Sequence, residues 1–209
     1  MSITKAEVLD VVRSRYLRRE EITNIDQQLA QVLVDISARA DFLVAETDVA
    51  PADKVPGPGY EDYIDFPVEV QVGAHKFAVE LRRIIRIDCD GEVVLMPFAD
   101  YRRRMLLNST VGQPLEYAVD RRRIWPYPPV DYPNRIVTLT WSYLHPATAE
   151  GVLFSEPLRA AINYGVVQQI AMDKELYDAA GAFGGLYEQQ IATQITLLQE
   201  QAQGVRYQE

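Results

Sequence analysis

The chain has 209 residues, of which 48% are hydrophobic, so it can bury a core, and one compact unit with an insertion fits this length. Its 30 acidic and 21 basic residues give a formal net charge of -9, which excludes non-specific coating of nucleic acid because phosphates require a positive surface. Cys89 is the only cysteine, so an intrachain disulfide is also excluded.

The first residues form neither a basic segment nor an apolar run, so the sequence predicts no signal peptide. No apolar stretch approaches the roughly 20 residues that a membrane span requires. A single cysteine is typical of proteins that fold in a reducing compartment. We therefore expect a protein made in a cytoplasm, with no membrane association.

Helices are expected over residues 1–47. Thr4 and Glu7 have the spacing of a capping box, which predicts a short helix to about Arg18. A second helix is expected to start near 23–26, because apolar residues then recur at steps of three and four. These residues are Ile22, Ile25, Leu29, Val32, Ile36 and Leu43.

Residues 48–65 contain closely spaced prolines and glycines, which favour neither helix nor strand. We interpret this segment as a long exposed loop. Loops of this length are uncommon in compact domains and are often functional.

Residues 66–150 are expected to be rich in strands. Asp90-Gly91 between two apolar runs is a strong hairpin signal, and residues 99–107 have helical spacing. The predicted strands are 66–72, 76–81, 83–88, 92–96, 115–119, 122–125 and 135–143.

Two closing helices are expected over residues 151–203, the first beginning at Ser155 with a proline in its first turn. The glycine-rich run 180–185 predicts a break between them, and residues 204–209 form a tail. The predicted fold class is therefore α+β, mainly α: a bundle of N- and C-terminal helices with an inserted antiparallel β-subdomain, all within one domain.

No constellation of residues predicts catalysis, a metal site or a cofactor. His75 and His145 lie far apart, and neither falls in a ligand or catalytic motif. Asp88 and Asp90 are explained by a turn, and Cys89 is most simply a small strand residue. We predict a protein that is not an enzyme.

Two arginine triplets interrupt the middle of the chain, where residues 76–135 carry 11 basic and 8 acidic side chains. They are Arg102, Arg103, Arg104, Arg121, Arg122 and Arg123. One interpretation is a solvated face with weak ion pairs. A second is a set of guanidinium groups that meets carboxylates of a neighbouring subunit or partner. DNA binding through the triplets is the third choice, because the chain is acidic overall.

Aromatic residues gather around the prolines that follow the second triplet. They are Trp125, Tyr127, Tyr132, Trp141 and Tyr143. We interpret them as the core of the β-subdomain, with an interface anchor as the alternative.

The order of these motifs resembles the head-to-tail adaptor proteins of tailed bacteriophages over most of residues 80–203. The resemblance is carried by Ile84-Ile-Arg-Ile87, Asp90-Gly91, Leu95, Asp100-Tyr-Arg-Arg-Arg104, Pro114-Leu-Glu-Tyr117, Ile124-Trp-Pro-Tyr-Pro-Pro129 and Leu139-Thr-Trp-Ser-Tyr143. Two features depart from the family pattern. Trp-Pro-Tyr-Pro-Pro replaces Tyr-Pro-x-Pro, and the loop 48–65 has no counterpart.

The resemblance implies a homo-oligomeric ring, usually of twelve subunits, in the neck of a virion. Such a ring contacts the portal protein above and a tail or nozzle protein below, and DNA passes through its channel without specific binding. A C-terminal arm commonly reaches into the portal, and the tail matches it by position. The interface residues assigned there are Val205, Arg206, Tyr207 and Gln208.

Two other classes of function remain open at this stage. One is a small hydrolase that uses carboxylates and His145 in a cleft of the β-region. The other is a helical-bundle interaction protein with no viral role.

Overall fold

The computed structural model divides the chain into two compact units. The helical unit comprises Met1–Leu43 and Leu144–Glu209, and the β-rich unit comprises Val44–Tyr143. The side chains of residues 15–16 and 202–206 are not described. The structure describes residues 3–16, 24–49, 63–72, 74–107, 112–130, 136–146 and 151–206.

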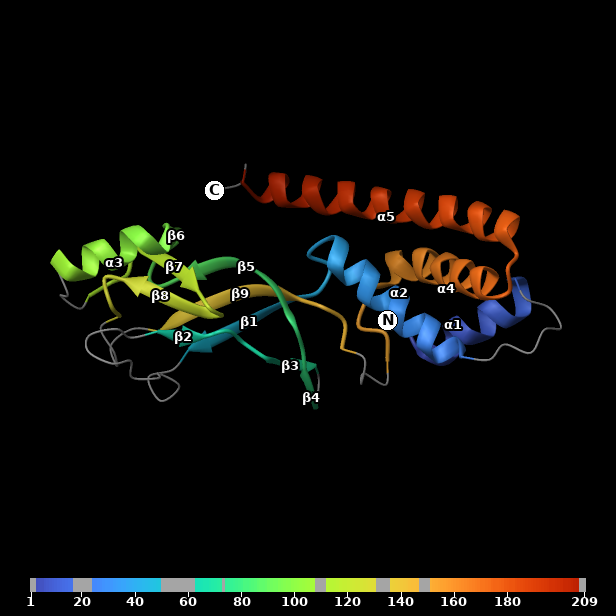
Figure 1. Ribbon diagram of the computed structural model, residues 1–209, viewed down its shortest axis with the longest axis horizontal. Helices are drawn as coiled ribbons and strands as arrows, with labels where there is room; N and C mark the ends of the chain where they lie inside the picture. Colours follow the sequence, from blue (N-terminus) through green and yellow to red (C-terminus); the bar gives the residue numbers. More distant parts are fainter. Residues whose placement is uncertain are drawn as a thin grey trace. The chain divides into compact units, whose positions relative to one another are not determined.

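The helical unit is built from both ends of the chain. Its elements are α1 (Lys5–Val11), the π-helical turn η1 (Val12–Tyr16), α2 (Ile25–Arg39), the 3-10 turn η3 (Glu156–Leu158), α4 (Arg159–Asp173) and α5 (Tyr177–Arg206). Helix α4 packs against α2 and lies alongside α5 (Figure 1).

The start of α1 is as the sequence predicts. Thr4 Oγ1 accepts a hydrogen bond from the Glu7 backbone N–H, and the Glu7 carboxylate accepts one from the Thr4 N–H. The Thr4 N–H lowers the pKa of Glu7, because hydrogen bonding favours the charged carboxylate.

The apolar stripe of the second predicted helix is confirmed. Ile25, Leu29, Val32 and Ile36 are all buried on α2. Leu43 is also buried, but it lies beyond the end of the helix.

The predicted break at residues 180–185 is wrong, because α5 runs through it without interruption. The chain turns earlier, where Glu175 adopts a left-handed backbone conformation with a φ of 57°. The Leu176 N–H donates to the Ala171 carbonyl and the Glu175 N–H donates to that of Met172, which is the Schellman pattern of a helix end.

The β-rich unit contains one helix, α3 (Phe98–Leu107), and nine strands. The strands are β1 (Val44–Val49), β2 (Ile64–Asp65), β3 (Glu69–Val72), β4 (His75–Ala78), β5 (Leu81–Asp88), β6 (Val94–Leu95), β7 (Glu116–Asp120), β8 (Arg123–Tyr127) and β9 (Val137–Tyr143).

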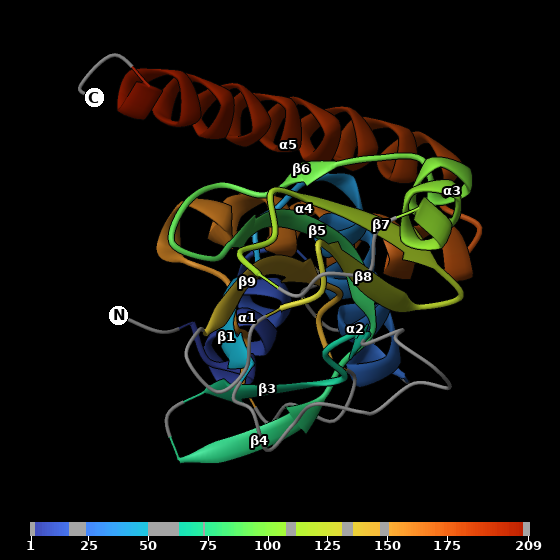
Figure 2. The same ribbon diagram turned by 90° about the vertical axis from the view of Figure 1, so that its left-hand side faces the viewer.

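These strands form three sheets, with the orders β1-β9-β5, β2-β8-β7-β6 and β3-β4. Figure 2 shows the β3–β4 hairpin as a two-stranded ribbon. Strand β1 pairs antiparallel with β9, and Val44 lies opposite Ser142. The chain therefore enters and leaves the β-rich unit through neighbouring strands.

The hairpin predicted around Asp90-Gly91 does not form as a strand pair. Asp88 and Glu92 make only an isolated bridge across the turn. Strand β5 instead pairs with β9, and β6 pairs in parallel with β7. The hairpin predicted near residues 115–125 does form, as β7 and β8.

The predicted fold class is wrong. The described residues form five α-helices and nine strands in three sheets, so the molecule is not a helical bundle with an antiparallel β-subdomain. Two physical causes explain the error. Strand β1 begins at Val44, inside the segment expected to be helical, and its partner β9 is distant in sequence, so local periodicity does not report the pairing.

Two predicted features lie largely outside the described residues. The exposed loop 48–65 overlaps β1 at one end and β2 at the other, and its central residues 50–62 are not described. Of the aromatic group, Tyr132 is likewise outside them.

Candidate functional site

The arginine-bearing elements of the β-rich unit are held by an aromatic cluster. Tyr101 of α3 stacks on Phe98 and packs against Trp125 of β8, with ring centroids 5.8 Å apart in both pairs. Tyr63 joins the cluster with its ring 5.1 Å from that of Trp125. This packing fixes α3 on the sheet that contains β7 and β8. Trp125 is buried as predicted, and the partly buried Tyr127 packs against the same cluster. Trp141 and Tyr143 are also buried as predicted, but they lie on β9 of a different sheet.

The first predicted triplet lies on α3, and its members differ in their contacts. Arg104 pairs with Glu116 at the start of β7, and its guanidinium lies 5.6 Å from the centre of the Tyr127 ring. Arg102 and Arg103 are exposed, and neither forms an ion pair with any other side chain that the structure describes. Helix α3 therefore presents two arginines to solvent and uses the third internally.

The second triplet forms the turn of the β7–β8 hairpin and the first residue of β8. Arg121 and Arg122 have φ angles of 48° and 66°, as a two-residue type I′ turn requires. Arg123 is held by Asp65 at 3.6 Å and lies 4.0 Å from the centre of the Tyr63 ring. The side chain of Arg121 is 90% exposed.

The structure does not bring the two triplets together. Arg104 contacts Glu116 and Tyr127, which lie opposite each other at the open end of the hairpin. Arg121 and Arg122 form its closed end, about 13 Å away at 3.3 Å per strand residue. The triplets are therefore two separate candidate surfaces.

Arg122 instead belongs to a groove that sequence reasoning missed. This arginine groove has a volume of about 520 Å³ and is lined by Arg82, Arg83 and Arg122 beside Leu95, Tyr117 and Val119. Leu95 and Val119 are exposed, so the groove offers apolar surface as well as charge. In the sequence, Arg82 and Arg83 are two adjacent basic residues at the boundary of two predicted strands. No local pattern links them to the turn that contains Arg122.

Burial raises the pKa of the Tyr117 hydroxyl in this groove, and the charge of Glu92 adds to the effect. Tyr117 therefore stays neutral and forms an aromatic wall of the groove. The groove combines guanidinium groups, the Glu80 carboxylate, a tyrosine and aliphatic side chains. Arginine and tyrosine are enriched at protein interfaces.

The candidate chemical residues are placed as structural groups. Cys89 is buried, and its carbonyl accepts a hydrogen bond from Gln113 Nε2. His145 is buried in the helical unit, with one ring nitrogen bonded to the Pro146 carbonyl and the other to the Leu153 N–H. Neither His145 nitrogen is available to a substrate in this arrangement.

Within the described part of the chain, no group of three or more His, Cys, Asp or Glu side chains is arranged to hold a metal ion. The predicted tail residues cannot be placed in a site. The backbone of Val205 and Arg206 belongs to α5, whereas Tyr207 and Gln208 lie outside the described residues.

Among the helices that the structure describes, none has the length and apolar character needed to cross a membrane. No protein-family model matches the chain, and no curated protein matches it significantly.

Proposed function

We propose that this chain is a structural protein of a virion neck, an adaptor that forms a ring of identical subunits between a portal and a tail or nozzle protein. The observation that carries the proposal is the pair of exposed arginines in the β7–β8 turn, the second of which lines the arginine groove. The resemblance of the motifs between Ile84 and Tyr143 to phage adaptors supports the same role.

The β7–β8 turn is informative because its residues, two arginines, are not those that its backbone conformation favours. Type I′ turns favour Asn-Gly, since asparagine and glycine tolerate positive φ, whereas a long side chain there stores strain. Arg121 and Arg122 adopt positive φ, and the contacts that hold the turn are a hydrogen bond from the Phe66 N–H to the Arg122 carbonyl and a long ion pair from Arg121 to Asp120. Strain of this kind is typical of functional positions.

The arginine groove suits a protein partner that carries carboxylates. Arginine forms bidentate pairs with carboxylates, and the exposed Leu95 and Val119 supply area that a partner removes from water. The chain is acidic overall, with a net charge of -9, so a second copy is a suitable source of such carboxylates. The same acidity allows DNA to pass through a ring without strong binding.

The test uses two variants of the turn. Arg121→Asn/Arg122→Gly replaces both arginines with the residues that the turn favours, so we expect its free energy of unfolding to rise by about 1–2 kcal/mol. Arg121→Asp/Arg122→Asp reverses both charges and keeps residues that accept positive φ. Both variants are expected to fold and to lose ring formation.

Assembly is measured by native mass spectrometry and negative-stain imaging, with the chain co-expressed with the portal protein of its own genome. Arg13→Asp is the control, because Arg13 is exposed in the helical unit. Rings with the control but not with the turn variants support the proposal. If the stabilised Asn-Gly variant assembles like the wild type, the two arginines are not part of an interface. If the wild type itself forms neither a ring nor a complex with the portal, the adaptor role is contradicted.

A further inference from the structure

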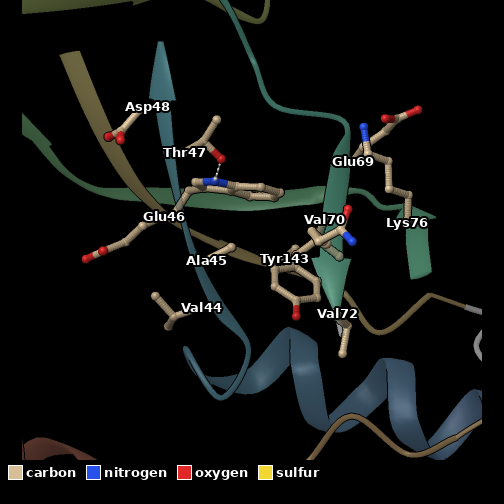
Figure 3. A pocket seen from close by; sticks show the side chains of 12 residues that line it. Val44, Ala45, Glu46, Thr47, Asp48, Glu69, Val70, Val72, Lys76 and Tyr143 are labelled. Carbon is tan, nitrogen blue, oxygen red and sulfur yellow. Dashed lines mark hydrogen bonds between the residues drawn. The ribbon is translucent and has the colours of Figure 1, made fainter. Parts of the chain in front are cut away.

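A second groove of the β-rich unit lies along the outer edge of β1. This edge groove has a volume of about 630 Å³, and its walls are Val44–Asp48 of β1 and Glu69–Val72 of β3. Trp141 and Tyr143 of β9 complete the lining with Lys76 of β4 (Figure 3). All of these residues belong to one compact unit.

The groove is bounded by the backbone of β1. Side chains of a strand alternate between its two faces, so one face alone contributes every second residue. Here five consecutive residues of β1 line the groove, which requires its backbone edge to face the space. No other strand of the described ranges pairs with that edge, because β1 is the outermost strand of the order β1-β9-β5.

The side chains of β1 alternate between the two faces of its sheet, and the two faces differ chemically. Ala45 and Thr47 point towards the groove, whereas Glu46 and Asp48 point away from it (Figure 3). The carboxylates therefore lie on the opposite face of the sheet, where they flank the position of any strand added next to β1.

The floor of the groove is apolar and held in place. The Trp141 indole N–H donates a hydrogen bond to Thr47 Oγ1 at 3.0 Å, and the Trp141 and Tyr143 ring centroids are 5.5 Å apart. Val70 of β3 is buried beside them. A preformed floor lowers the entropic penalty of binding.

We propose that the edge groove binds an extended segment of a partner protein, which adds to β1 as a further antiparallel or parallel strand. Main-chain hydrogen bonds to the β1 edge supply affinity, and alternate side chains supply specificity. Residues on the groove face meet Ala45 and Thr47, which line it together with the buried Trp141 and Tyr143, so they are apolar. Residues on the other face lie across from Glu46 and Asp48, so they are lysine or arginine, because opposite charges across strands stabilise a sheet.

The dimensions agree with a short segment. Strand β1 has six residues and spans about 20 Å, and a volume of about 630 Å³ falls in the range of pre-formed ligand sites. A five-residue strand therefore matches the edge. The inference does not depend on the adaptor role, since it follows from the sheet edge alone.

The experiment uses three acetylated and amidated peptides and isothermal titration calorimetry. Val-Arg-Val-Arg-Val is the probe, Val-Glu-Val-Glu-Val is its charge-reversed counterpart, and the third is the probe with its backbone amides N-methylated at alternate residues. We expect the wild-type chain to bind the arginine peptide at least tenfold more tightly than the glutamate peptide. N-methylation is expected to abolish binding, because it removes the main-chain donors.

A charge-reversed variant makes the test sharper. Glu46→Lys/Asp48→Lys alters exposed side chains and removes one exposed hydrogen bond, from Thr138 Oγ1 to Asp48, but it leaves the groove floor and the β1–β9 main-chain pairing intact. Circular dichroism is therefore expected to remain native. Its preference between the two charged peptides is expected to invert. The matched control is Asp10→Lys/Glu200→Lys, which makes the same change in net charge on exposed positions of the helical unit and is expected to keep the wild-type preference.

Three results overturn the inference. They are no binding of the arginine peptide at millimolar concentration, an unchanged preference in Glu46→Lys/Asp48→Lys, and equal binding of the N-methylated peptide. A loss of ring assembly in the turn variants has no bearing on these outcomes, so this inference and the proposed function fail separately.

Discussion

His145 is a buried histidine whose surroundings favour the neutral ring. Its Nδ1 donates to the Pro146 carbonyl at 3.1 Å, and its Nε2 accepts from the Leu153 N–H at 3.1 Å. The His145 backbone N–H donates to Ser37 Oγ at 2.9 Å. Burial is the main cause that lowers the pKa of His145 to about 4, and the nearby Lys5 charge adds to it.

This lowered pKa predicts acid-sensitive stability of the helical unit. Below the ordinary pKa of 6.5, His145 binds a proton in the unfolded chain but not in the folded protein. The free energy of unfolding therefore decreases as the pH is lowered from about 6.5, until the folded histidine also titrates near 4. We expect a loss of roughly 2–3 kcal/mol from this residue between pH 7.5 and 4.5. Urea unfolding followed by helical circular dichroism at the two pH values measures the loss.

His145→Gln is the matched variant, because its carbonyl oxygen can accept from the Leu153 N–H and does not titrate. The variant carries the same carboxylates as the wild type. The difference between the two proteins in how the free energy of unfolding depends on pH therefore gives the contribution of His145. Equal pH dependence in both proteins would show that the histidine does not drive the effect.

At the scale of elements, Gly165 sets the spacing of three helices. A Cβ atom placed there would lie 2.8 Å from Val32 Cγ1 and 3.1 Å from Tyr187 Cε2. Tyr187 is itself buried and donates a hydrogen bond of 2.5 Å to Asp35 Oδ2, so it is not free to move aside. Burial and the Asp35 charge both raise the pKa of Tyr187, which keeps its hydroxyl a donor.

Gly165→Ala is therefore expected to destabilise the helical unit. Overpacking costs about 1–3 kcal/mol, and it exceeds the gain of up to about 1 kcal/mol in helix propensity. Gly185→Ala is the control, since a Cβ at that position of α5 meets nothing within 4 Å. It is expected to raise stability by about 0.5–1 kcal/mol. Thermal unfolding of both variants tests the opposite signs, and two shifts in the same direction contradict this account of the packing.

These glycines also show where sequence reasoning succeeds and fails. The capping box at Thr4 and the stripe on α2 are predictable because they depend on neighbours within a few residues. Gly184 suggests a helix break, yet it lies inside α5, where a Cβ would contact Gln168 on the adjacent helix. A tertiary contact of this kind overrides local propensity and leaves no local signal.

For the candidate surfaces too, local features were predictable from the sequence and tertiary contacts were not. The exposure of Arg121 was predictable, because a hairpin places its turn in solvent, whereas Arg122 was assigned to the following strand and instead lies in the turn. Their separation from Arg104 and their proximity to Arg82 were not, because both depend on how sheets assemble. The β1 edge was hidden for a further reason, since its pairing with β9 joins segments about ninety residues apart.

At the scale of the whole molecule, the chain enters and leaves the β-rich unit at neighbouring positions of one sheet. Val44 and Ser142 are opposite each other in the β1–β9 ladder, so the two chain crossings are about 5 Å apart. Each unit also has its own buried residues, with Trp141 in the β-rich unit and Ile162 in the helical unit. The chain therefore has the organisation of one folding unit inserted into another.

This organisation predicts that each unit folds without the other. Residues 44–143 expressed alone are expected to unfold cooperatively, because β1 and β9 close the fragment at its own ends. Residues 1–43 joined to 144–209 by three glycines are expected to form the helical unit, since a three-residue link spans the gap between paired strands. Circular dichroism and urea unfolding measure both. An unfolded β-rich fragment, or a helical fragment without a cooperative transition, would show that the units depend on each other for stability and that the insertion is topological only.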